Sequence, residues 1–204
     1  MQPRHKSSIL PITFFLLAFL PLSASAHITG AMGSAGSGFF SGFMHPFGGL
    51  DHILAMLAVG MWAAQLGGRA LWMLPGSFLL VMALSGIAGI AGLPLGNVEL
   101  GIALSVVALG GVVAINVRPS LGIAAMVVTV FAVFHGYSHG AEMSAQMSAL
   151  SFSAGFVVAT GLIILSGIVI GLAARLPHGM KLLRNAGATI SIAGIYLVGK
   201  MFIG

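Results

Sequence analysis

The chain carries very little charge. Of its 204 residues, 8 are Lys or Arg and 3 are Asp or Glu, so 5% are charged, whereas a soluble domain carries about 25%. Hydrophobic residues make up 58%, and the mean hydropathy is +1.11. So few charges cannot solvate the outside of a water-soluble globule, and this composition also excludes a disordered chain. The class that remains is a membrane protein.

Three further absences narrow the function. There is no cysteine, which excludes disulfide frameworks, thiolate metal sites and cysteine nucleophiles. No complete phosphate-binding loop of the GxxxxGK[ST] type is present, so the sequence does not predict nucleotide hydrolysis. The net charge of +5 is spread along the chain without forming a basic patch, which argues against nucleic acid as a partner.

The first 26 residues are typical of a secretory signal peptide. A positively charged start at residues 4–6 precedes an apolar run over 9–22, and Ala24-Ser25-Ala26 matches a small-x-small cleavage site. We therefore expect cleavage after Ala26, with an uncleaved first transmembrane helix as the alternative. The mature chain, 27–204, would then form a single six-helix transmembrane domain.

Polar, glycine and proline breaks divide the mature chain into six apolar stretches, each near the roughly 20 residues that a helix needs to cross a bilayer. We expect an all-α membrane protein, a six-transmembrane-helix bundle after removal of the signal peptide. Small-xxx-small spacings, Gly38 with Gly42 and Gly167 with Gly171, predict close helix packing within the bundle; a homo-oligomer stays open. The expected spans are 39–63, 71–91, 98–115, 121–140, 149–173 and 185–203.

The basic residues predict the orientation. Cytoplasmic loops are enriched in Lys and Arg. The cleaved signal peptide independently places His27 outside. Both arguments predict a bacterial inner (cell) membrane protein whose mature N-terminus and C-terminus are periplasmic. Lys200, near the end of the last span, is expected on the periplasmic side. The expected cytoplasmic loops hold Arg69, Arg118, Arg175, Lys181 and Arg184.

Ionisable residues inside the expected spans form two clusters, at 45–52 in the first span and at 135–142 in the fourth. A charged side chain at mid-membrane costs about 2.5–3.5 kcal/mol on insertion scales, so such residues indicate function. The first span runs inward and the fourth runs outward, which places both clusters at a similar depth. We therefore expect one shared site that opens toward the outside.

Helical geometry supports this convergence. On a wheel of 100° per residue, His45, His52 and Met56 lie within about 40° of one another, and a second such face joins the fourth-span residues His135, His139 and Glu142. Pro46 and the following glycine pair indicate that the first span kinks or begins its regular helix there.

Imidazoles with carboxylates and no thiolate suit a divalent first-row metal such as Ni, Co, Zn, Cu or Fe. The aspartate either ligates directly or accepts a ring N–H and fixes the histidine tautomer. A competing interpretation gives each histidine only an interhelical hydrogen bond. The metal ligands that we expect are His45, Asp51, His52, His135 and His139. Further candidates for metal binding or ion access are His27, Glu142, Glu99 and Met56.

Two motifs resemble the HupE/UreJ family of small bacterial membrane proteins. They are His-Pro-x-x-Gly-x-Asp-His at residues 45–52 and Phe-His-Gly-x-x-His-Gly-x-Glu at 134–142. The resemblance extends over essentially the whole chain. It implies an association with hydrogenase or urease gene clusters and a function in the uptake of nickel or cobalt. The five residues between His45 and Asp51 differ from the four in the related signature of the larger nickel/cobalt transporter family, which argues against that family.

The resulting hypothesis is a secondary or facilitated permease for Ni²⁺ or Co²⁺, not an enzyme. It has no permanently bound cofactor, and its partners are the divalent ion and the lipid bilayer. The alternatives are a membrane haem-binding protein and a metal-delivery accessory protein for hydrogenase or urease maturation. An intramembrane metalloenzyme ranks last, because no general base stands apart from the candidate ligands.

Overall fold

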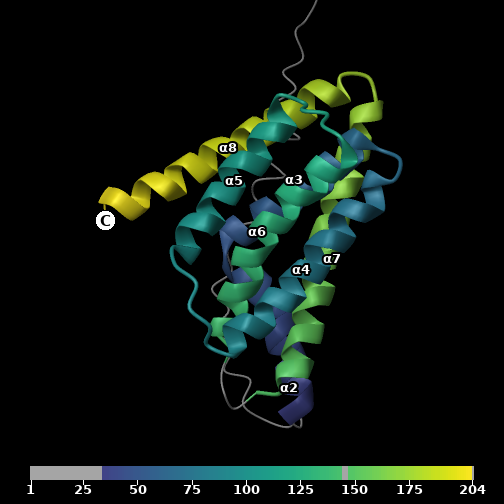
Figure 1. The fold of residues 1–204 in the computed structure, drawn as a ribbon. Helices are drawn as coiled ribbons and strands as arrows, with labels where there is room; N and C mark the ends of the chain where they lie inside the picture. The colour runs from purple at the N-terminus through teal and green to yellow at the C-terminus, as the bar shows by residue number, and fades with distance from the viewer. Residues whose placement is uncertain (1–33, 144–146, 204) are drawn as a thin grey trace, which may run out of the picture. The chain divides into compact units, whose positions relative to one another are not determined.

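The structure is a computed structural model that describes residues 34–143 and 147–203. The predicted signal peptide, its cleavage site and His27 lie outside the described residues. Within these residues, all regular secondary structure is helical (Figure 1). The helices are α2 (Ser34–Met44), η1 (His45–Gly48), α3 (Leu50–Leu66), α4 (Ala70–Ile90), α5 (Val98–Ala114), α6 (Leu121–Ala141), α7 (Ala149–Leu172), η2 (Ala173–Arg175) and α8 (Gly179–Ile203).

Four helices, α4, α6, α7 and α8, are long and apolar enough to cross a membrane. The bent pair formed by α2, η1 and α3 passes the same test as a fifth candidate. Helix α5 is apolar but has 17 residues, which is the lower limit for a crossing. The prediction of an all-helical, multi-pass membrane protein is thereby confirmed, with four or five candidate spans by length and composition rather than the expected six.

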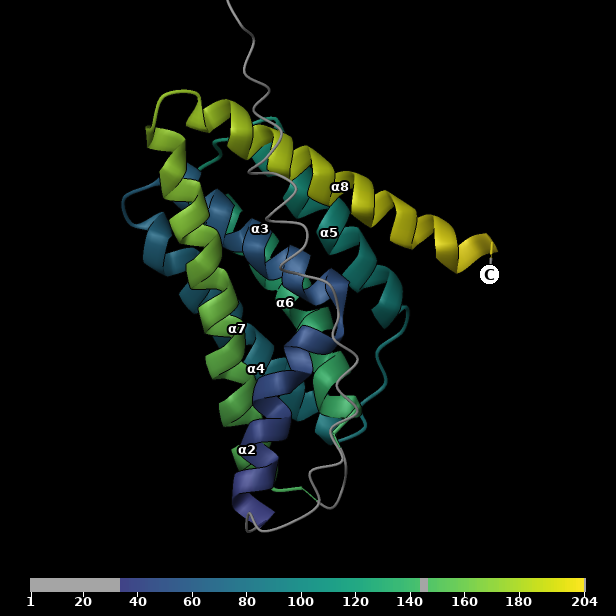
Figure 2. The ribbon, with the colours of Figure 1, turned by 180° about the vertical axis from the view of Figure 1, so that it is seen from behind.

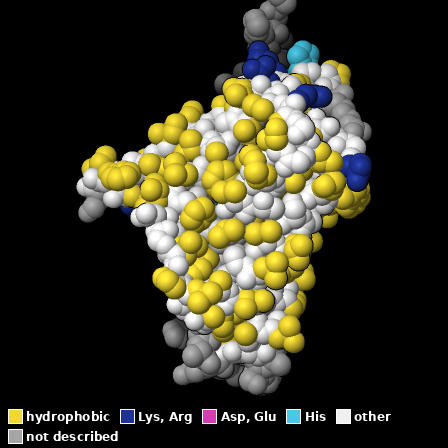
Figure 3. All heavy atoms as spheres, viewed as in Figure 1, with side chains coloured by type: hydrophobic (Ala, Val, Ile, Leu, Met, Phe, Trp, Pro, Cys, Tyr) yellow, Lys and Arg dark blue, Asp and Glu magenta, His cyan; other side chains and the backbone are white. Residues whose placement is uncertain are grey.

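The flanks of the described bundle are covered by apolar side chains (Figure 3). Trp72, Leu80 and Ile87 on α4 are each more than 60% exposed. In water such a surface would drive association, whereas hydrocarbon is its natural solvent. Most of the Lys and Arg side chains visible in Figure 3 gather toward the end of the bundle where α7 passes into α8.

The first expected span, 39–63, is not one helix. It breaks at residues 45–49 and bends by 85° between α2 and α3. Pro46 occupies the first turn of η1, where its missing N–H costs nothing, and Gly49 is extended with φ −116° and ψ 119°. The helical wheel drawn through His45 and His52 is therefore wrong, because His45 belongs to the 3-10 turn and His52 belongs to α3.

Close backbone contacts hold the helices together, as the small-xxx-small spacings predict. A Cβ atom at Gly42 would overlap the carbonyl oxygen of Phe152, and one at Gly167 would overlap the carbonyl oxygen of Leu57. Successive parts of α7 thus pack first on α2 and then on α3 (Figure 2). The broken first span and α7 consequently lie side by side along most of their length.

Three side-chain hydrogen bonds bring the α3–α4, α5–α6 and α7–α8 connections to the same end of the bundle. Trp62 Nε1 donates to the carbonyl oxygen of Val117 at 2.9 Å, and Gln65 Nε2 donates to that of Val113 at 2.9 Å. Arg184 Nε donates to the carbonyl oxygen of Ala114 at 2.8 Å. The predicted cytoplasmic loops therefore share one end, and the histidine-bearing part of α6 approaches the opposite end.

Candidate metal site

His52 lies in the first turn of α3, and its neighbour Asp51 fixes its tautomer. Asp51 Oδ1 accepts the His52 backbone N–H at 2.8 Å and the ring Nδ1–H at 2.7 Å. With the ring proton on Nδ1, the lone pair of Nε2 is free. That Nε2 is buried and has no hydrogen-bond partner in the described part of the chain. Asp51 thus holds the His52 ring in the arrangement that is common at metal sites, where a carboxylate accepts one ring N–H and leaves the other nitrogen for the ion.

His135 on α6 is held by Ser105 on α5. The single hydroxyl proton of Ser105 goes to the carbonyl oxygen of Ile102 at 2.6 Å. The Ser105 oxygen therefore accepts the His135 Nε2–H across 2.8 Å. This leaves His135 Nδ1 with a free lone pair, and the atom is buried without a hydrogen-bond partner among the described residues.

His139, one turn after His135, lies between the other rings. Its ring centroid is 4.6 Å from that of His45 and 4.3 Å from that of His52. The Phe156 ring packs against it at 4.1 Å. Both ring nitrogens of His139 are buried and find no hydrogen-bond partner among the residues that the structure describes, and each such unsatisfied group costs about 1–3 kcal/mol.

His45 and Glu142 close the outer side of the cluster. His45 Nε2–H donates to Glu142 Oε2 at 3.1 Å, and the Ser138 hydroxyl donates to Glu142 Oε1 at 2.8 Å. Among the described residues, His45, His139 and Glu142 each offer a ligand atom within 4.8 Å of the others. Two imidazoles and a carboxylate at this spacing are able to converge on one divalent ion.

Solvent exposure falls steeply across the cluster. The Glu142 side chain is 52% exposed and that of His45 is 29% exposed, whereas His139, His52 and His135 are all buried. A cavity of about 20 Å³ lies beside His139 between α4, α6 and α7, which is room for one water molecule. From solvent, the Glu142 carboxylate is therefore reached first and the buried imidazoles lie behind it.

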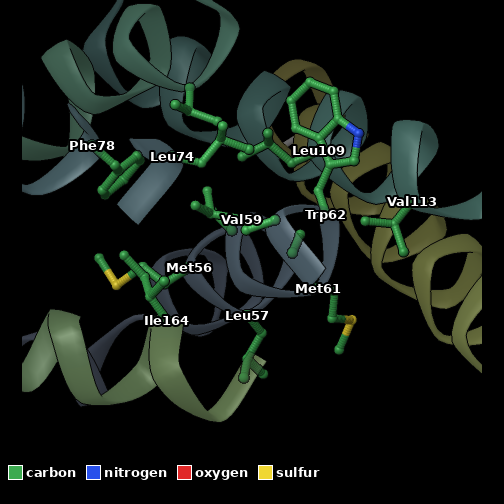
Figure 4. Close-up of a cluster of buried hydrophobic side chains, with 14 of the residues drawn as sticks. Met56, Leu57, Val59, Met61, Trp62, Leu74, Phe78, Leu109, Val113 and Ile164 are labelled. Carbon is green, nitrogen blue, oxygen red and sulfur yellow. The ribbon is translucent and has the colours of Figure 1, made fainter. Parts of the chain in front are cut away.

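Apolar side chains form a floor on the far side of the histidines. Met56, Val59, Leu74 and Phe78 are fully buried together (Figure 4). The Phe78 ring contacts the His135 ring at a centroid distance of 5.9 Å. This floor separates the histidine cluster from the basic end of the bundle in the described conformation.

The structure brings together most of the residues that the sequence singles out, but not all. Glu99 is exposed in the first turn of α5 and makes no contact with the cluster among the described residues. Met56 is fully buried in the hydrophobic core. Sequence reasoning missed Ser105 and Phe156. The signal that could have identified Ser105 is that it is a lone serine in an otherwise apolar span.

These features define a class: a multi-pass helical membrane protein with a buried imidazole-and-carboxylate cluster between a broken first span and α6. The family model described as HupE / UreJ protein matches residues 15–197, and the chain belongs to this family. It is 44% identical over 195 residues to Protein HupE of Rhizobium leguminosarum bv. viciae, a match that covers 95% of this chain and 98% of that protein. No solved structure matches the chain. The predicted resemblance is confirmed.

Proposed function

We propose that the chain is a permease for a divalent transition-metal ion, Ni²⁺ or Co²⁺, that works by secondary or facilitated uptake. Membership of the HupE/UreJ family supports this proposal, as does the His45, His139 and Glu142 group. The residues proposed to hold the ion are these three with His52 and His135. Asp51 is proposed to act mainly by orienting His52.

One observation carries the proposal. In residues 34–143 and 147–203, four imidazole nitrogens on three histidines are buried without hydrogen-bond partners from the same residues. Buried polar groups are nearly always satisfied, and an exception calls for an explanation such as an ion. The competing interpretation, in which each histidine only joins helices by hydrogen bonds, does not account for these atoms. Each of the three neutral rings has one nitrogen with a lone pair. A metal ion would use these three lone pairs, and borderline donors of this kind suit Ni²⁺ and Co²⁺.

The proposed permease crosses a bacterial inner membrane six times, with the bent α2–α3 pair as the first crossing and α5 as the third. The end that carries Arg69, Arg118 and Arg184 then faces the cytoplasm, in agreement with the enrichment of basic residues there. Glu142 and His45 face the periplasm, where an incoming ion arrives, and both chain ends lie on that side.

The packing of the rings favours an ion over haem. A haem between two histidines would separate their rings by more than the thickness of the macrocycle, whereas these rings contact one another at centroid distances of 4.3–4.7 Å. A metal-delivery protein that binds an ion without transporting it would use the same ligands. Transport therefore has to be measured directly.

The test is ion uptake by the purified chain in proteoliposomes that contain a metal-sensitive dye. We expect saturable uptake of Ni²⁺ or Co²⁺ and loss of at least tenfold in rate for His139→Ala. The matched control is His178→Asn, because His178 is an exposed histidine with φ 64°, a conformation that Asn tolerates. Binding without uptake would favour delivery instead, and equal uptake by both variants would overturn the proposed site.

A further inference from the structure

His139 has a different set of metal-binding groups on each side. On its outer side are His45 and Glu142, which lie with it in the three-residue group within 4.8 Å. On its inner side is His52, with a ring centroid 4.3 Å away. His135 follows, 4.7 Å from His52 and nearly perpendicular to it at 89°. Within the described part of the chain, neither nitrogen of the shared ring is engaged in a hydrogen bond, so its one lone-pair nitrogen can serve either side when the ring rotates.

The two sides differ in chemistry. The outer group combines two imidazoles with a half-exposed carboxylate. On the inner side, the free atoms are His52 Nε2 and His135 Nδ1, and the Asp51 carboxylate faces the opposite nitrogen of the His52 ring. The inner side therefore offers nitrogen atoms only.

We propose that the ion occupies two positions in turn, an outer one at His45, His139 and Glu142 and an inner one at His52 and His135, with His139 shared between them. This inference rests on the proposed function. Of the described residues, only the outer group has three ligand atoms within 4.8 Å in this conformation. Rotation of the His139 ring toward His52 supplies the third ligand of the inner position as the ion moves inward.

Ser105 is the positioning residue of the inner position. It holds the proton of His135 on Nε2 through the chain of hydrogen bonds that ends at the Ile102 carbonyl oxygen. Without the serine hydroxyl, the His135 ring is free to change tautomer or rotate. Partners of this kind behind a ligand typically contribute 10–100-fold to metal affinity.

The order of the two positions provides selectivity. A hydrated carboxylate attracts any divalent cation, including Mg²⁺ and Ca²⁺, which prefer oxygen ligands. A site built from imidazoles alone retains Ni²⁺, Co²⁺, Cu²⁺ or Zn²⁺ and disfavours the hard ions. We therefore expect Mg²⁺ to compete with the transition metal at the outer position only.

The experiment uses the full chain in detergent, with Co²⁺ as the probe. Calorimetry gives the affinity, and X-ray absorption gives the ligand atoms. Glu142→Gln removes the outer carboxylate, and we expect this variant to keep one Co²⁺ bound through nitrogen ligands. Adding Ser105→Ala in that background should lower the Co²⁺ affinity about 10–100-fold, whereas Ser105→Thr, which keeps the hydroxyl, should restore it.

Ser85→Ala is the matched control, because the hydrogen bonds of the Ser85 hydroxyl within the described residues go to the carbonyl oxygens of Met82 and Ala132 and to no histidine. Helix content and unfolding temperature show whether each variant is folded. Equal Co²⁺ affinities for the Ser105→Ala and Ser85→Ala variants would overturn the role of Ser105. Failure of a folded Glu142→Gln variant to bind Co²⁺, while the unsubstituted chain binds and transports it, would remove the inner position and leave the proposed function standing.

Discussion

Asp51 is the residue whose role the structure refines most. Both the backbone N–H and the ring Nδ1–H of His52 donate to Asp51 Oδ1, so this oxygen is already engaged. We predict that Asp51→Ala lowers Co²⁺ affinity about 10–100-fold, as for other partners behind a metal ligand. Asp51→Asn keeps an acceptor oxygen for the ring proton and should retain most of the affinity.

Co²⁺ titration of the two Asp51 variants distinguishes orientation from direct ligation. If the carboxylate itself binds the ion, Asn and Ala will be equally damaging, and X-ray absorption will show one oxygen ligand fewer in both. A variant with weakened binding but an unchanged ligand count supports the orienting role.

At this scale the sequence identifies residue types better than hydrogen-bond roles. His45, His52, His135 and His139 stand out because imidazoles are rare in apolar helices, and all four come together. The tautomer of His135 could not be predicted, because its partner Ser105 lies 30 residues away on a helix whose rotation is set by packing. The choice for Asp51 between ligating and orienting likewise depends on a distance of 2.7 Å that no spacing rule provides.

Among the elements, the break between α2 and α3 depends on Gly49. A Cβ atom there would lie 2.6 Å from Asp51 Oδ1 and 2.8 Å from His52 Nδ1, which are closer than real Cβ contacts. Gly49→Ala should therefore displace the Asp51–His52 pair and weaken Co²⁺ binding. The neighbouring Gly48→Ala is the control, since a Cβ at Gly48 would meet nothing within 4 Å.

The comparison of the two glycine variants needs both affinity and thermal stability. We expect Gly48→Ala to bind Co²⁺ like the unsubstituted chain and Gly49→Ala to bind it at least tenfold more weakly, with helix content preserved. If the two variants bind equally, the break does not position His52, and the extended backbone at Gly49 has only a topological role.

The helix boundaries were the most predictable level of the fold. The expected limits of 121–140 and 149–173 differ by one residue each from α6 and α7, because glycine, proline and polar breaks end apolar runs sharply. Helix α8 begins at Gly179, six residues before the expected 185, since basic residues at a membrane surface continue a helix without interrupting it. The 85° bend at 45–49 was predicted only as a kink or a late helix start, since Pro and Gly permit a break without fixing its angle.

For the whole molecule, the absence of cysteine allows the proposed six crossings to be mapped with single-cysteine variants. Gly96→Cys lies between α4 and α5, Leu176→Cys lies between α7 and α8, and Ile203→Cys ends α8; all three positions are exposed. In cells whose outer membrane is permeabilised and whose inner membrane is intact, an impermeant maleimide should label the variants at 96 and 203. It should label the variant at 176 only after the inner membrane is disrupted.

Labelling of Ile203→Cys and Leu176→Cys from the same side would remove the crossing by α8. Labelling of Gly96→Cys and Leu176→Cys from the same side would remove a crossing between them, and the opposite pattern at all three positions would reverse the orientation. The unsubstituted chain, which has no thiol, gives the background. The comparison of positions 96 and 176 bears most strongly on α5, because its 17 residues lie at the limit for a bilayer.

The energy available for uptake also belongs to the whole molecule. An inside-negative potential of 100 mV favours the inward movement of each unit charge by about 2.3 kcal/mol, or about 4.6 kcal/mol for a divalent ion. In the proposed permease, the buried apolar floor of Met56, Val59, Leu74 and Phe78 would close the inward route, so that the ion would pass only when this floor rearranges. Uptake should therefore be driven by the potential and yet saturate with ion concentration.

Proteoliposomes with a potassium diffusion potential test both properties. Accumulation of Ni²⁺ or Co²⁺ should rise when the interior is made negative and fall to the equilibrium ratio when the potential is collapsed. Because each 1.4 kcal/mol is a factor of ten, about 4.6 kcal/mol sets a limit near a thousandfold accumulation. Uptake that continues unchanged without a potential would require another driving force, such as coupling to protons, and a rate that rises linearly with ion concentration would contradict a closed floor.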